Sequence, residues 1–397
     1  MKEESLKQLK NINLSGRRVL LRCDLNVPFD DNETLLDDTR ITSIIPTINY
    51  LAQSGAKIVL ASHFGRPNGK VDPKLSLRKL IPYLETYYNV SVKFIADIFS
   101  QDSVDIIKQL HSTEIALLEN LRFHEGEESN DKSFAKQLSK FCDIYVNDAF
   151  SCCHRRHASI EAITEFVPSY PGLLVANEMQ HLNTALNGNR RPQTLIIGGK
   201  KISTKLSVLK NLANKVDNIV IGGAMANNFF KALGLQVGSS FYEENFIQEA
   251  KNLYYEYQDK IVLPTDFVGK NSANKLFIKQ LADISGDDCV LDIGPNSCEK
   301  IHNILKSSKV VVWNGPIGFY EEPQYAVSSL YIARAIAYLT KIDGLISIIG
   351  GGDAAAVAKM SGLKSDFSYI STGGGAFLEL LEKGNLIGLT HLREKKI

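Results

Sequence analysis

The chain has 397 residues, a formal net charge of +1, 44% hydrophobic residues and 22% charged residues. Single hydrophobic cores stop growing at roughly 250 to 300 residues, so we expect two domains or one large α/β domain. The near-neutral charge excludes a bulk field for binding nucleic acid or an anionic membrane, and we expect neither partner.

The first residues, MKEESLKQLKNINL, are charged and lack the apolar centre of a signal peptide, and no apolar run is long enough to cross a bilayer. We therefore expect a cytoplasmic location. Six cysteines without metal-type spacing indicate reduced thiols. Cys152-Cys153 has two interpretations, a reactive pair or two small residues beside a loop, and the second is the more usual.

Apolar, strand-like runs in the first half end in polar and often cationic residues. The runs are Arg17–Pro28 (RRVLLRCDLNVP), Ala56–Pro67 (AKIVLASHFGRP), Glu114–Arg122 (EIALLENLR) and Phe141–Ser159 (FCDIYVNDAFSCCHRRHAS). Helical segments rich in Leu, Lys and Glu lie between them, such as Lys74–Tyr88 and Asp131–Lys140. Alternating strands and helices predict a parallel sheet with both faces covered.

Ligands of open parallel sheets bind outside the carboxyl ends of the strands, and here those ends carry cations. A single arginine is more typical of a surface charge or a structural ion pair. Repetition at strand after strand favours a site for a small polyanion, because guanidinium groups match carboxylate and phosphate oxygens in bidentate fashion. The cations concerned are Arg22, Arg40, His63, Arg66, Arg122 and Arg155.

Phe166–Asn189 is punctuated by Pro168, Pro171 and Gly172 before a segment of helix length, which predicts a connector helix between two lobes. In the second half the apolar runs end in glycine instead of arginine. The runs are TLIIGGKKISTKL from Thr194, NIVIGGAMA from Asn218, VLDIGP from Val290, VVVWNGPIG from Val310 and YISTGGGA from Tyr369. Their recurrence predicts several loops around one backbone-lined nucleotide site, with Lys200, Lys201 and Lys205 as candidates to meet phosphate. No G-x-x-x-x-G-K-[ST] loop occurs.

Leu345–Met360, LISIIGGGDAAAVAKM, predicts a strand, a glycine turn and a helix. Gly350, Gly351 and Gly352 would let the backbone approach a ligand, and the N–H groups of the following helix suit a phosphate. The alternative is a tight turn that needs only glycine conformations. Because the first half supplies a second anion site, we favour phosphoryl transfer between two bound ligands, a reaction that relies on positioning and charge neutralisation.

These residues resemble those of phosphoglycerate kinases over essentially the whole chain. The motifs RCDLNVP, SHFGRP, LLENLRFHEGEE, VNDAF with HRRHAS, IIGGKKISTKL, GGAMA, VVWNGPIGFYE, GGGD and STGGGA stand in the order and spacing of that family. The resemblance implies an α/β fold of two Rossmann-like domains, each a parallel sheet covered by helices, joined by an interdomain helix. The implied segments are a phosphoglycerate-binding domain at 1–171, the helix at 172–188, a nucleotide-binding domain at 189–380 and a segment at 381–397 that returns to the first domain.

The resemblance also implies reversible, Mg²⁺-assisted phosphoryl transfer between 1,3-bisphosphoglycerate with ADP and 3-phosphoglycerate with ATP, in glycolysis, by hinge closure of a monomer. The acceptor is a carboxylate with a pKa of roughly 3.5 to 4, which is ionised at neutral pH, so no general base is needed. By motif match, the catalytic residues would be Arg40 and Lys201, and Asp353 would approach Mg²⁺. The acid substrate would be bound by Asp24, Leu25, Asn26, Arg40, His63, Phe64, Gly65, Arg66, Arg122 and Arg155. The nucleotide would be bound by Lys201, Glu321, Gly350, Gly351, Gly352 and Asp353.

Some of these assignments have plain alternatives. Asp353 would also suit a helix cap, and Glu322 is a rival to Glu321. His63 would also suit a structural role, and Trp313 is more typical of core packing than of base stacking. The chain departs from the family pattern at Lys200 and Ala354, at Ser328-Ser329, and at Arg156, which adds a second cation beside Arg155.

Two other functions compete with the kinase. Gly350, Gly352 and Ala355 match the G-x-G-x-x-A pattern of a dinucleotide-dependent dehydrogenase, but fewer than about fifty residues follow, too few for a full dinucleotide domain. The other competing function is that of a two-lobed binding protein, which closes on an anion without chemistry. Such proteins are typically exported, whereas the first residues of this chain lack the apolar centre of a signal peptide.

Overall fold

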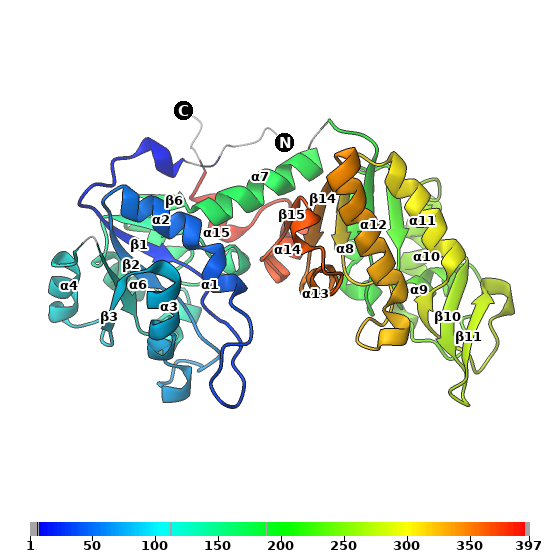
Figure 1. The fold of residues 1–397 in the computed structure, drawn as a ribbon, viewed down its shortest axis with the longest axis horizontal. Helices are drawn as coiled ribbons and strands as arrows, with labels where there is room; N and C mark the ends of the chain where they lie inside the picture. The colour runs from blue at the N-terminus through cyan, green and yellow to red at the C-terminus, as the bar shows by residue number, and fades with distance from the viewer. Residues whose placement is uncertain (1–5, 7, 112, 188, 394–397) are drawn as a thin grey trace. The chain divides into compact units, whose positions relative to one another are not determined.

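The computed structural model describes residues 6, 8–111, 113–187 and 189–393, and the chain divides into two compact units. The first unit comprises Met1–Met179 and Asn385–Ile397, and the second comprises Gln180–Gly384. In Figure 1 the colour follows the residue number, and the red helix labelled α15 (Ile387–Thr390) belongs to the mainly blue and cyan first unit. The domain limits implied by the family resemblance stay predictions, and residues 394–397 of the returning segment lie outside the described residues.

The first unit is built on a six-stranded sheet in the order β3-β4-β2-β1-β5-β6, and every neighbouring pair is parallel. Its strands are β1 (Arg18–Arg22), β2 (Lys57–Ala61), β3 (Ser91–Ile95), β4 (Glu114–Leu118), β5 (Ile144–Asn147) and β6 (Ser169–Pro171). Its helices are α1 (Thr39–Ser43), α2 (Ile45–Gln53), α3 (Ile81–Tyr88), α4 (Gln101–Lys108), α5 (Glu125–Glu128), α6 (Lys132–Ser139) and α15 (Ile387–Thr390). The order β4-β2-β1-β5 makes neighbours of the strands that precede the predicted cations.

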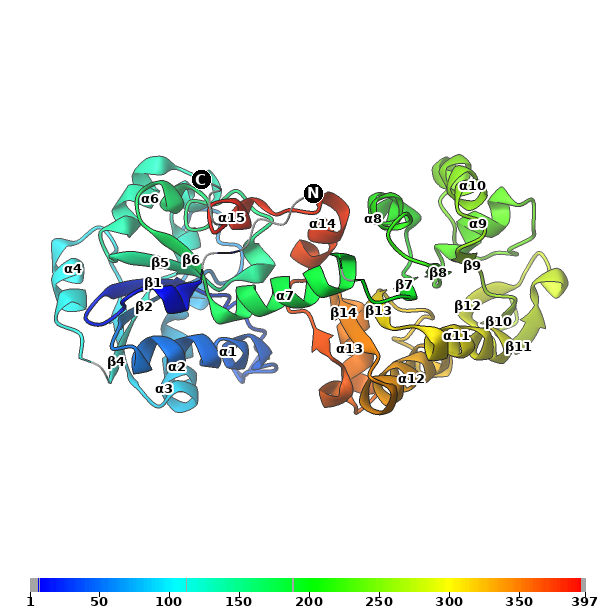
Figure 2. The same ribbon diagram turned by 90° about the horizontal axis from the view of Figure 1, so that it is seen from above.

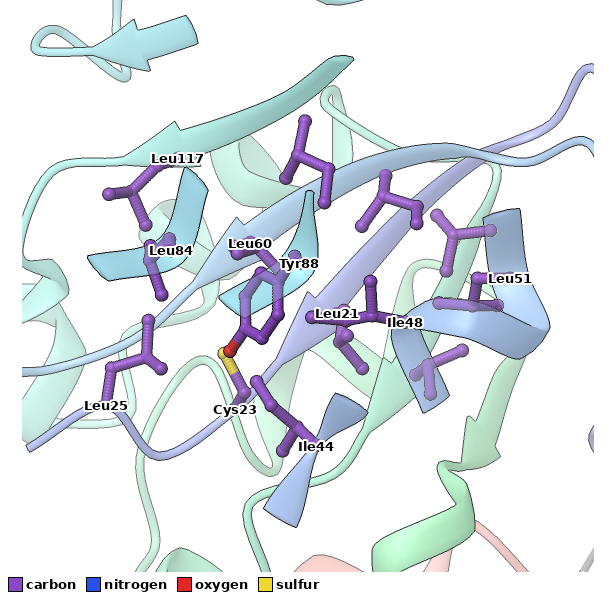
Figure 3. Packing of buried hydrophobic residues seen from close by; sticks show 14 of the residues in the cluster. Leu21, Cys23, Leu25, Ile44, Ile48, Leu51, Leu60, Leu84, Tyr88 and Leu117 are labelled. Atoms are coloured by element: carbon purple, nitrogen blue, oxygen red, sulfur yellow. The ribbon is translucent and has the colours of Figure 1, made fainter. Parts of the chain in front are cut away.

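Side chains of successive strand residues point to opposite faces of this sheet, so each strand feeds two cores. Leu21 of β1 packs with Ile48 and Leu84 on the face covered by α1, α2 and α3, whereas Leu20 packs with Phe134 on the face covered by α6. Figure 2 shows the two helical layers, and Figure 3 shows Leu21, Leu60 and Leu117 of three strands against the helices of the first layer. Burial on both faces explains why these strands read as continuous apolar runs.

Helix α7 (Leu173–Asn187) carries the chain from the first unit to the second. Its first turn is fixed by two buried residues of the first unit. Leu173 donates its backbone N–H to Oγ1 of Thr47 at 3.0 Å, and Val175 donates to Oδ1 of Asp148 at 3.1 Å. Thr47 Oγ1 in turn donates to Oδ2 of Asp148 at 2.5 Å. Burial raises the pKa of Asp148 to about 7, and these hydrogen bonds only partly oppose that shift.

Residues near the end of the chain complete the core of the first unit. Gly388, in α15, donates its N–H to the carbonyl oxygen of Cys153 at 2.8 Å and accepts from Nδ2 of Asn147 at 3.5 Å. A Cβ at Gly388 would lie 2.7 Å from a side-chain carbon of Ile160, so only glycine allows this close approach. Leu389 is fully buried beside it.

The second unit has its own six-stranded parallel sheet, in the order β15-β14-β13-β7-β8-β9. Its strands are β7 (Gln193–Ile197), β8 (Asn218–Ile221), β9 (Ile261–Val262), β13 (Val310–Asn314), β14 (Ile346–Gly350) and β15 (Tyr369–Ile370). Its helices are α8 (Leu206–Leu212), α9 (Ala226–Ala232), α10 (Ile247–Glu256), α11 (Pro295–Ser307), α12 (Val327–Asp343), α13 (Gly352–Met360) and α14 (Gly375–Lys383). Figure 2 shows α11, α12 and α13 on one face, and α8, α9, α10 and α14 on the other.

Trp313, in β13, is fully buried in the core beneath α11, α12 and α13 and donates its indole N–H to the carbonyl oxygen of Gly315 at 2.7 Å. The core-packing interpretation of this residue is therefore confirmed.

A three-stranded antiparallel sheet, β11-β10-β12, is an element that the sequence reasoning did not include. Its strands are β10 (Asp266–Lys270), β11 (Leu276–Gln280) and β12 (Cys289–Ile293). The sequence pattern predicts VLDIGP as a strand of the parallel sheet, and this prediction is wrong, because the run forms β12, which pairs with β10 in antiparallel fashion. No helix within the described residues is long and apolar enough to cross a membrane.

Candidate active site

The carboxyl ends of four neighbouring strands in the first unit bring the predicted acid-site residues to one edge of the sheet. β1 leads into Asp24, Leu25 and Asn26, and β2 leads into the turn that carries His63. β4 is followed by the short 3-10 helix of Arg122, and the segment after β5 carries Arg155. The edge forms because parallel strands end side by side.

Hydrogen bonds lock the turns of this edge to one another. Leu25 donates its N–H to Oγ of Ser62 at 2.9 Å, and Gly65 donates to Oδ1 of Asn26 at 2.9 Å. Phe64 donates to Oδ1 of Asn120 at 3.1 Å. Leu25, Phe64 and Gly65 therefore hold the turns together through their backbone N–H groups. The side chains of Leu25 and Phe64 are buried.

Arg40 and Asp24 form the outer ion pair of the edge. NH1 of Arg40 lies 3.1 Å from Oδ2 of Asp24 and donates to the carbonyl oxygen of Asn26 at 2.6 Å. Ser151 also donates to Oδ2 of Asp24, at 2.5 Å. The Arg40 side chain remains 39% exposed, so its guanidinium keeps donors for a ligand.

Arg122 is almost fully buried and is held by two contacts. NH1 donates to the carbonyl oxygen of Gly65 at 2.8 Å, and Nε lies 3.1 Å from Oε1 of Glu128. Arg66 follows on the same turn as Gly65, and its side chain is exposed.

Two histidines report the positive potential of this edge. Burial lowers the pKa of His63 well below its ordinary value, and the charges of Arg22, Arg122, Arg155 and Arg40 lower it further. Burial lowers the pKa of His157 to about 3, and the charges of Arg122, Arg22 and Arg155 contribute to that shift. Both imidazoles are therefore neutral at physiological pH, and the edge draws its charge from the arginines.

The structure separates the two adjacent arginines that the sequence left as rivals. Arg156 is exposed and pairs with Glu161 through two hydrogen bonds of 2.9 Å. Arg155 is half-buried, and its charge lowers the pKa of both His63 and His157. Arg155 therefore belongs to the cationic edge, and Arg156 belongs to a surface ion pair.

The second unit contains a largely apolar cavity of about 360 Å³, beside the glycine-bearing turns of its parallel sheet. It is lined by Gly199, Lys200, Gly223, Ala224, Ala226, Asn227, Phe241, Pro264, Phe267, Cys289, Val290, Leu291, Asp292, Ile293, Pro316, Ile317, Gly318, Phe319, Glu321 and Asp353. An apolar cavity with a few polar groups at its wall is the usual form of a nucleotide or other small-molecule site.

Of the six predicted nucleotide residues, two are among those that line this cavity. Glu321 and Asp353 line it, whereas Glu322 is not among the lining residues and accepts from Gln324 instead. Of the two adjacent lysines, Lys200 lines the cavity, with Nζ 4.9 Å from the centre of the Phe241 ring. Lys201 is exposed and is not among the lining residues.

The three glycines at the start of α13, Gly350, Gly351 and Gly352, have three different roles. A Cβ at Gly350 would lie 2.1 Å from the ring of Phe377, so this glycine makes room for a neighbouring helix. Gly351 has φ of +89°, a conformation that L side chains rarely adopt. A Cβ at Gly352 would meet nothing within 4 Å, so its backbone faces open space at the start of the helix. Gly352 is thus the glycine best suited to an anion.

Polar side chains fix this turn and place a cation beside it. Lys205 Nζ donates to Oδ1 of Asn314 at 2.5 Å, and Nδ2 of Asn314 donates to the carbonyl oxygen of Gly350 at 2.7 Å. Burial lowers the pKa of Lys205, and the nearby carboxylate of Asp353 opposes that shift.

Asp353 does not cap α13, which has Gly351 at its N-cap and no side-chain cap. The capping interpretation is therefore wrong, because Asp353 is the second residue of the helix, two positions after the N-cap, and accepts from Oη of Tyr320 at 3.2 Å.

The polar groups in the wall of the cavity are compatible with a magnesium ion. No group of three or more His, Cys, Asp or Glu within the described residues would hold a metal by itself. Mg²⁺ is usually bound by one or two carboxylates together with substrate phosphates and water. Asp353, beside the glycine turn at the start of α13, supplies one carboxylate in the cavity wall.

Several residues of the two sites escaped the sequence reasoning. Phe241 and Phe267 line the cavity from segments without a recognisable motif. Asp292 is buried in its wall, accepts from Oγ and N of Ser328, and has its pKa raised to about 6 by burial. Ser329 accepts from the N–H groups of Ile317 and Gly318 at 3.1 Å, which explains why Ser328-Ser329 suits the start of α12.

Comparisons with known proteins place the chain beside one family over nearly its whole length. The family model described as phosphoglycerate kinase matches residues 9–384. A phosphoglycerate kinase of Prochlorococcus marinus is 41% identical over 99% of this chain and 100% of its own length. One of Orientia tsutsugamushi is 42% identical over 98% of both chains.

Two solved structures have the same fold. The structure of phosphoglycerate kinase from Coxiella burnetii superposes with a TM-score of 0.88 at 32% identity, covering 98% of this chain and 99% of that chain. The structure of phosphoglycerate kinase from Pyrococcus horikoshii superposes with a TM-score of 0.83 at 30% identity, covering 97% and 98%. A match of this extent in sequence and fold shows that the chain belongs to the phosphoglycerate kinase family.

Proposed function

We propose that this kinase transfers a phosphoryl group reversibly between 1,3-bisphosphoglycerate with ADP and 3-phosphoglycerate with ATP. The observation that carries the proposal is the gathering of Arg22, Arg40, Arg122 and Arg155 around His63. Four arginines around one histidine suit a small molecule that bears both a phosphate and a carboxylate. The other unit supplies the nucleotide cavity with Glu321 and Asp353 in its wall.

The reaction needs little covalent chemistry from the protein. The acceptor carboxylate is already ionised at neutral pH, so its oxygen attacks the terminal phosphorus without a general base. The remaining barrier is repulsion among anions, which Arg40 on one side and Lys201 on the other would offset. Lys205 and the N–H groups at the start of α13 would hold the nucleotide phosphates. Mg²⁺, held by Asp353 and the phosphates, would withdraw negative charge from the transferred group.

Transfer requires the acid and the nucleotide to come within reacting distance and water to be excluded. We infer that the two units close on their ligands by bending at the segments that join them, and that the enzyme acts as a monomer in the cytoplasm. Hinge closure of this kind is a common way to assemble a site from two domains.

A coupled assay with ATP, Mg²⁺ and 3-phosphoglycerate tests the proposal. We expect ADP formation that depends on all three, and the label of γ-³²P-ATP should appear in the acid product. Binding of both ligands without transfer of label would instead support a two-lobed binding protein. A change in absorbance with NAD and candidate substrates would support the dehydrogenase alternative.

A further inference from the structure

Four buried side chains form a continuous line of contacts beneath the cationic edge of the first unit. They are Glu127 of α5, Ser159 in the segment after β5, Arg22 at the end of β1 and His63 in the turn after β2. Glu127 and Ser159 are completely inaccessible to solvent, and Arg22 and His63 are 1% and 3% exposed. A buried charge is costly unless it is paired and hydrogen-bonded, so the contacts of this line are strongly constrained.

The direction of each hydrogen bond follows from the groups at its ends. Glu127 accepts twice from Ser159, from the hydroxyl at 2.6 Å and from the backbone N–H at 2.9 Å. Because the Ser159 proton is engaged with Glu127, the hydroxyl oxygen is free to accept from Nε of Arg22 at 2.8 Å. A guanidinium has only donors, so the order Arg22 to Ser159 to Glu127 cannot be reversed.

The far end of Arg22 sets the state of His63. NH2 of Arg22 lies 3.3 Å from Nδ1 of His63, and NH1 of Arg22 is engaged with the carbonyl oxygen of Cys23 at 2.5 Å. Since Arg22 can only donate, Nδ1 of His63 must be the unprotonated nitrogen, and Nε2 carries the proton of the neutral ring.

The charged groups around His63 oppose a second proton on its ring, and its remaining hydrogen-bonding neighbour is too weak an acceptor to hold one. Arg22, Arg122, Arg155 and Arg40 are cationic, and the only other partner among the described residues is the Cys152 thiol, whose sulfur lies 4.0 Å from Nδ1. The imidazole therefore stays neutral over the physiological range of pH.

We propose that Glu127 and Ser159 are positioning residues for the acid substrate, because they fix Arg22 and thereby hold His63 as a neutral Nε2–H donor. The proposal rests on the assignment of the cationic edge as the acid-substrate site. A neutral donor suits this place, since it adds a directed hydrogen bond to an anion without adding to the repulsion among four arginines. A merely structural network would contribute to stability without controlling the tautomer of His63.

The test measures the tautomer directly. The chain contains eight histidines, and the spectrum of His63→Gln identifies the signals of His63 in two-dimensional ¹H–¹⁵N spectra of ¹⁵N-histidine-labelled full-length enzyme. The variants are Ser159→Ala, which removes the hydroxyl between Arg22 and Glu127, and Glu127→Gln, which removes the carboxylate charge. Ser297→Ala is the matched control, because Ser297 is also buried and donates to a buried carboxylate, Asp266, at 2.5 Å in the second unit.

In the native enzyme we expect the Nε2–H tautomer of His63 between pH 6 and 8. Ser159→Ala and Glu127→Gln should shift His63 to a mixture of tautomers and raise the KM for 3-phosphoglycerate about tenfold, the effect of losing one hydrogen bond to a charged group. The KM for ATP should stay within about twofold, and Ser297→Ala should change neither readout.

A native His63 that is protonated, or that carries its proton on Nδ1, would overturn the proposal. So would a Ser159→Ala variant that keeps both the native tautomer and the native KM for the acid, or equal effects of Ser159→Ala and Ser297→Ala. If Ser159→Ala does not fold, the native spectrum and Glu127→Gln decide the question. The tautomer is measured without substrate, so a native enzyme that fails to turn over 3-phosphoglycerate would refute the proposed function and leave this result readable.

Discussion

Lys205 and Asn314 are joined by a hydrogen bond of 2.5 Å from Nζ to Oδ1, although they are 109 residues apart in the chain. Asn314 in turn donates from Nδ2 to the carbonyl oxygen of Gly350, so the lysine is connected to the glycine turn at the start of α13. A half-buried cation held in this way is preorganised, because it need not be ordered when an anion binds.

Replacement of Lys205 by alanine should therefore lower kcat/KM for ATP by about 100-fold, the scale found when one preorganised donor is removed from a reacting anion. Steady-state kinetics with varied ATP measures it. Lys210→Ala, an exposed lysine of the following helix α8, is the control and should retain native kinetics. Equal activity of both variants would remove Lys205 from the phosphate site.

Arg40→Ala should leave the fold intact and nearly abolish turnover, because an arginine on a transferring phosphoryl group contributes about 10³- to 10⁵-fold in rate. Its side chain is half-exposed, so its loss should change the thermal midpoint little. Arg78→Ala is the control, since Arg78 is exposed and lies over the ring of Phe94. A variant at position 40 that keeps more than about a tenth of native kcat would exclude Arg40 from the mechanism.

The two adjacent lysines Lys200 and Lys201 should separate kinetically. Lys200 lines the cavity, so Lys200→Ala should raise the KM for ATP about fivefold with kcat nearly unchanged. Lys201 is proposed to neutralise the transfer site, so Lys201→Ala should lower kcat by at least about 100-fold. Initial-rate measurements at varied ATP distinguish the two patterns, and an exchange of the two results would reverse the assignment.

Glu321 and Glu322 offer a similar comparison at the cavity wall. Glu321 lines the cavity and Glu322 does not. Glu321→Gln should raise the dissociation constant of ADP about tenfold by weakening a hydrogen bond to the ligand, whereas Glu322→Gln should leave it unchanged. Isothermal titration calorimetry of the two variants measures the difference. Equal affinities would place Glu321 outside the nucleotide contacts.

Asp148 should make stability depend on pH in an unusual direction. Burial raises its folded-state pKa from 3.8 to about 7, so between these values the folded protein holds a proton that the unfolded chain has released. Its contribution to the free energy of unfolding is present at low pH and is lost as the pH rises toward 7, with a slope on the order of 1 kcal/mol per pH unit.

Urea unfolding of native enzyme and Asp148→Asn from pH 4.5 to 8 checks this expectation. The native protein should lose stability relative to the variant as the pH rises. The exposed Asp259→Asn is the control and should follow the native curve. Parallel curves for the native enzyme and Asp148→Asn would show that Asp148 titrates near its ordinary pKa.

Apolar runs in the sequence predict the central strands correctly, because β1, β2, β13 and β14 are buried on both faces. The edge strands β3 and β9 and the hairpin of β10 and β11 escaped detection. β11 alternates exposed and half-buried residues and is short, so its pattern is weak. The pairing of β12 with this hairpin depends on tertiary contacts that no local pattern carries.

Part of the candidate site could also be predicted from the positions of the strands in the sequence. Residues such as Asp24, His63 and Arg122 stand directly after strands, and strand order then decides that they meet. Phe241 and Phe267 reach the cavity from segments whose sequence carries no such signal. The choice between Lys200 and Lys201 depends on the direction of one side chain, and this is set by backbone angles that the sequence does not specify.

The attachment of Gly388 to Cys153 and Asn147 also bears on how the protein is made. A ribosome releases the chain from the amino end, and domains usually fold as they emerge. Here the leading unit lacks part of its interior until residues 385–393 have been translated, after the whole of the trailing unit. Nascent chains stalled before Asn385 should thus remain sensitive to protease in their first 179 residues, and chains released a few codons later should become resistant.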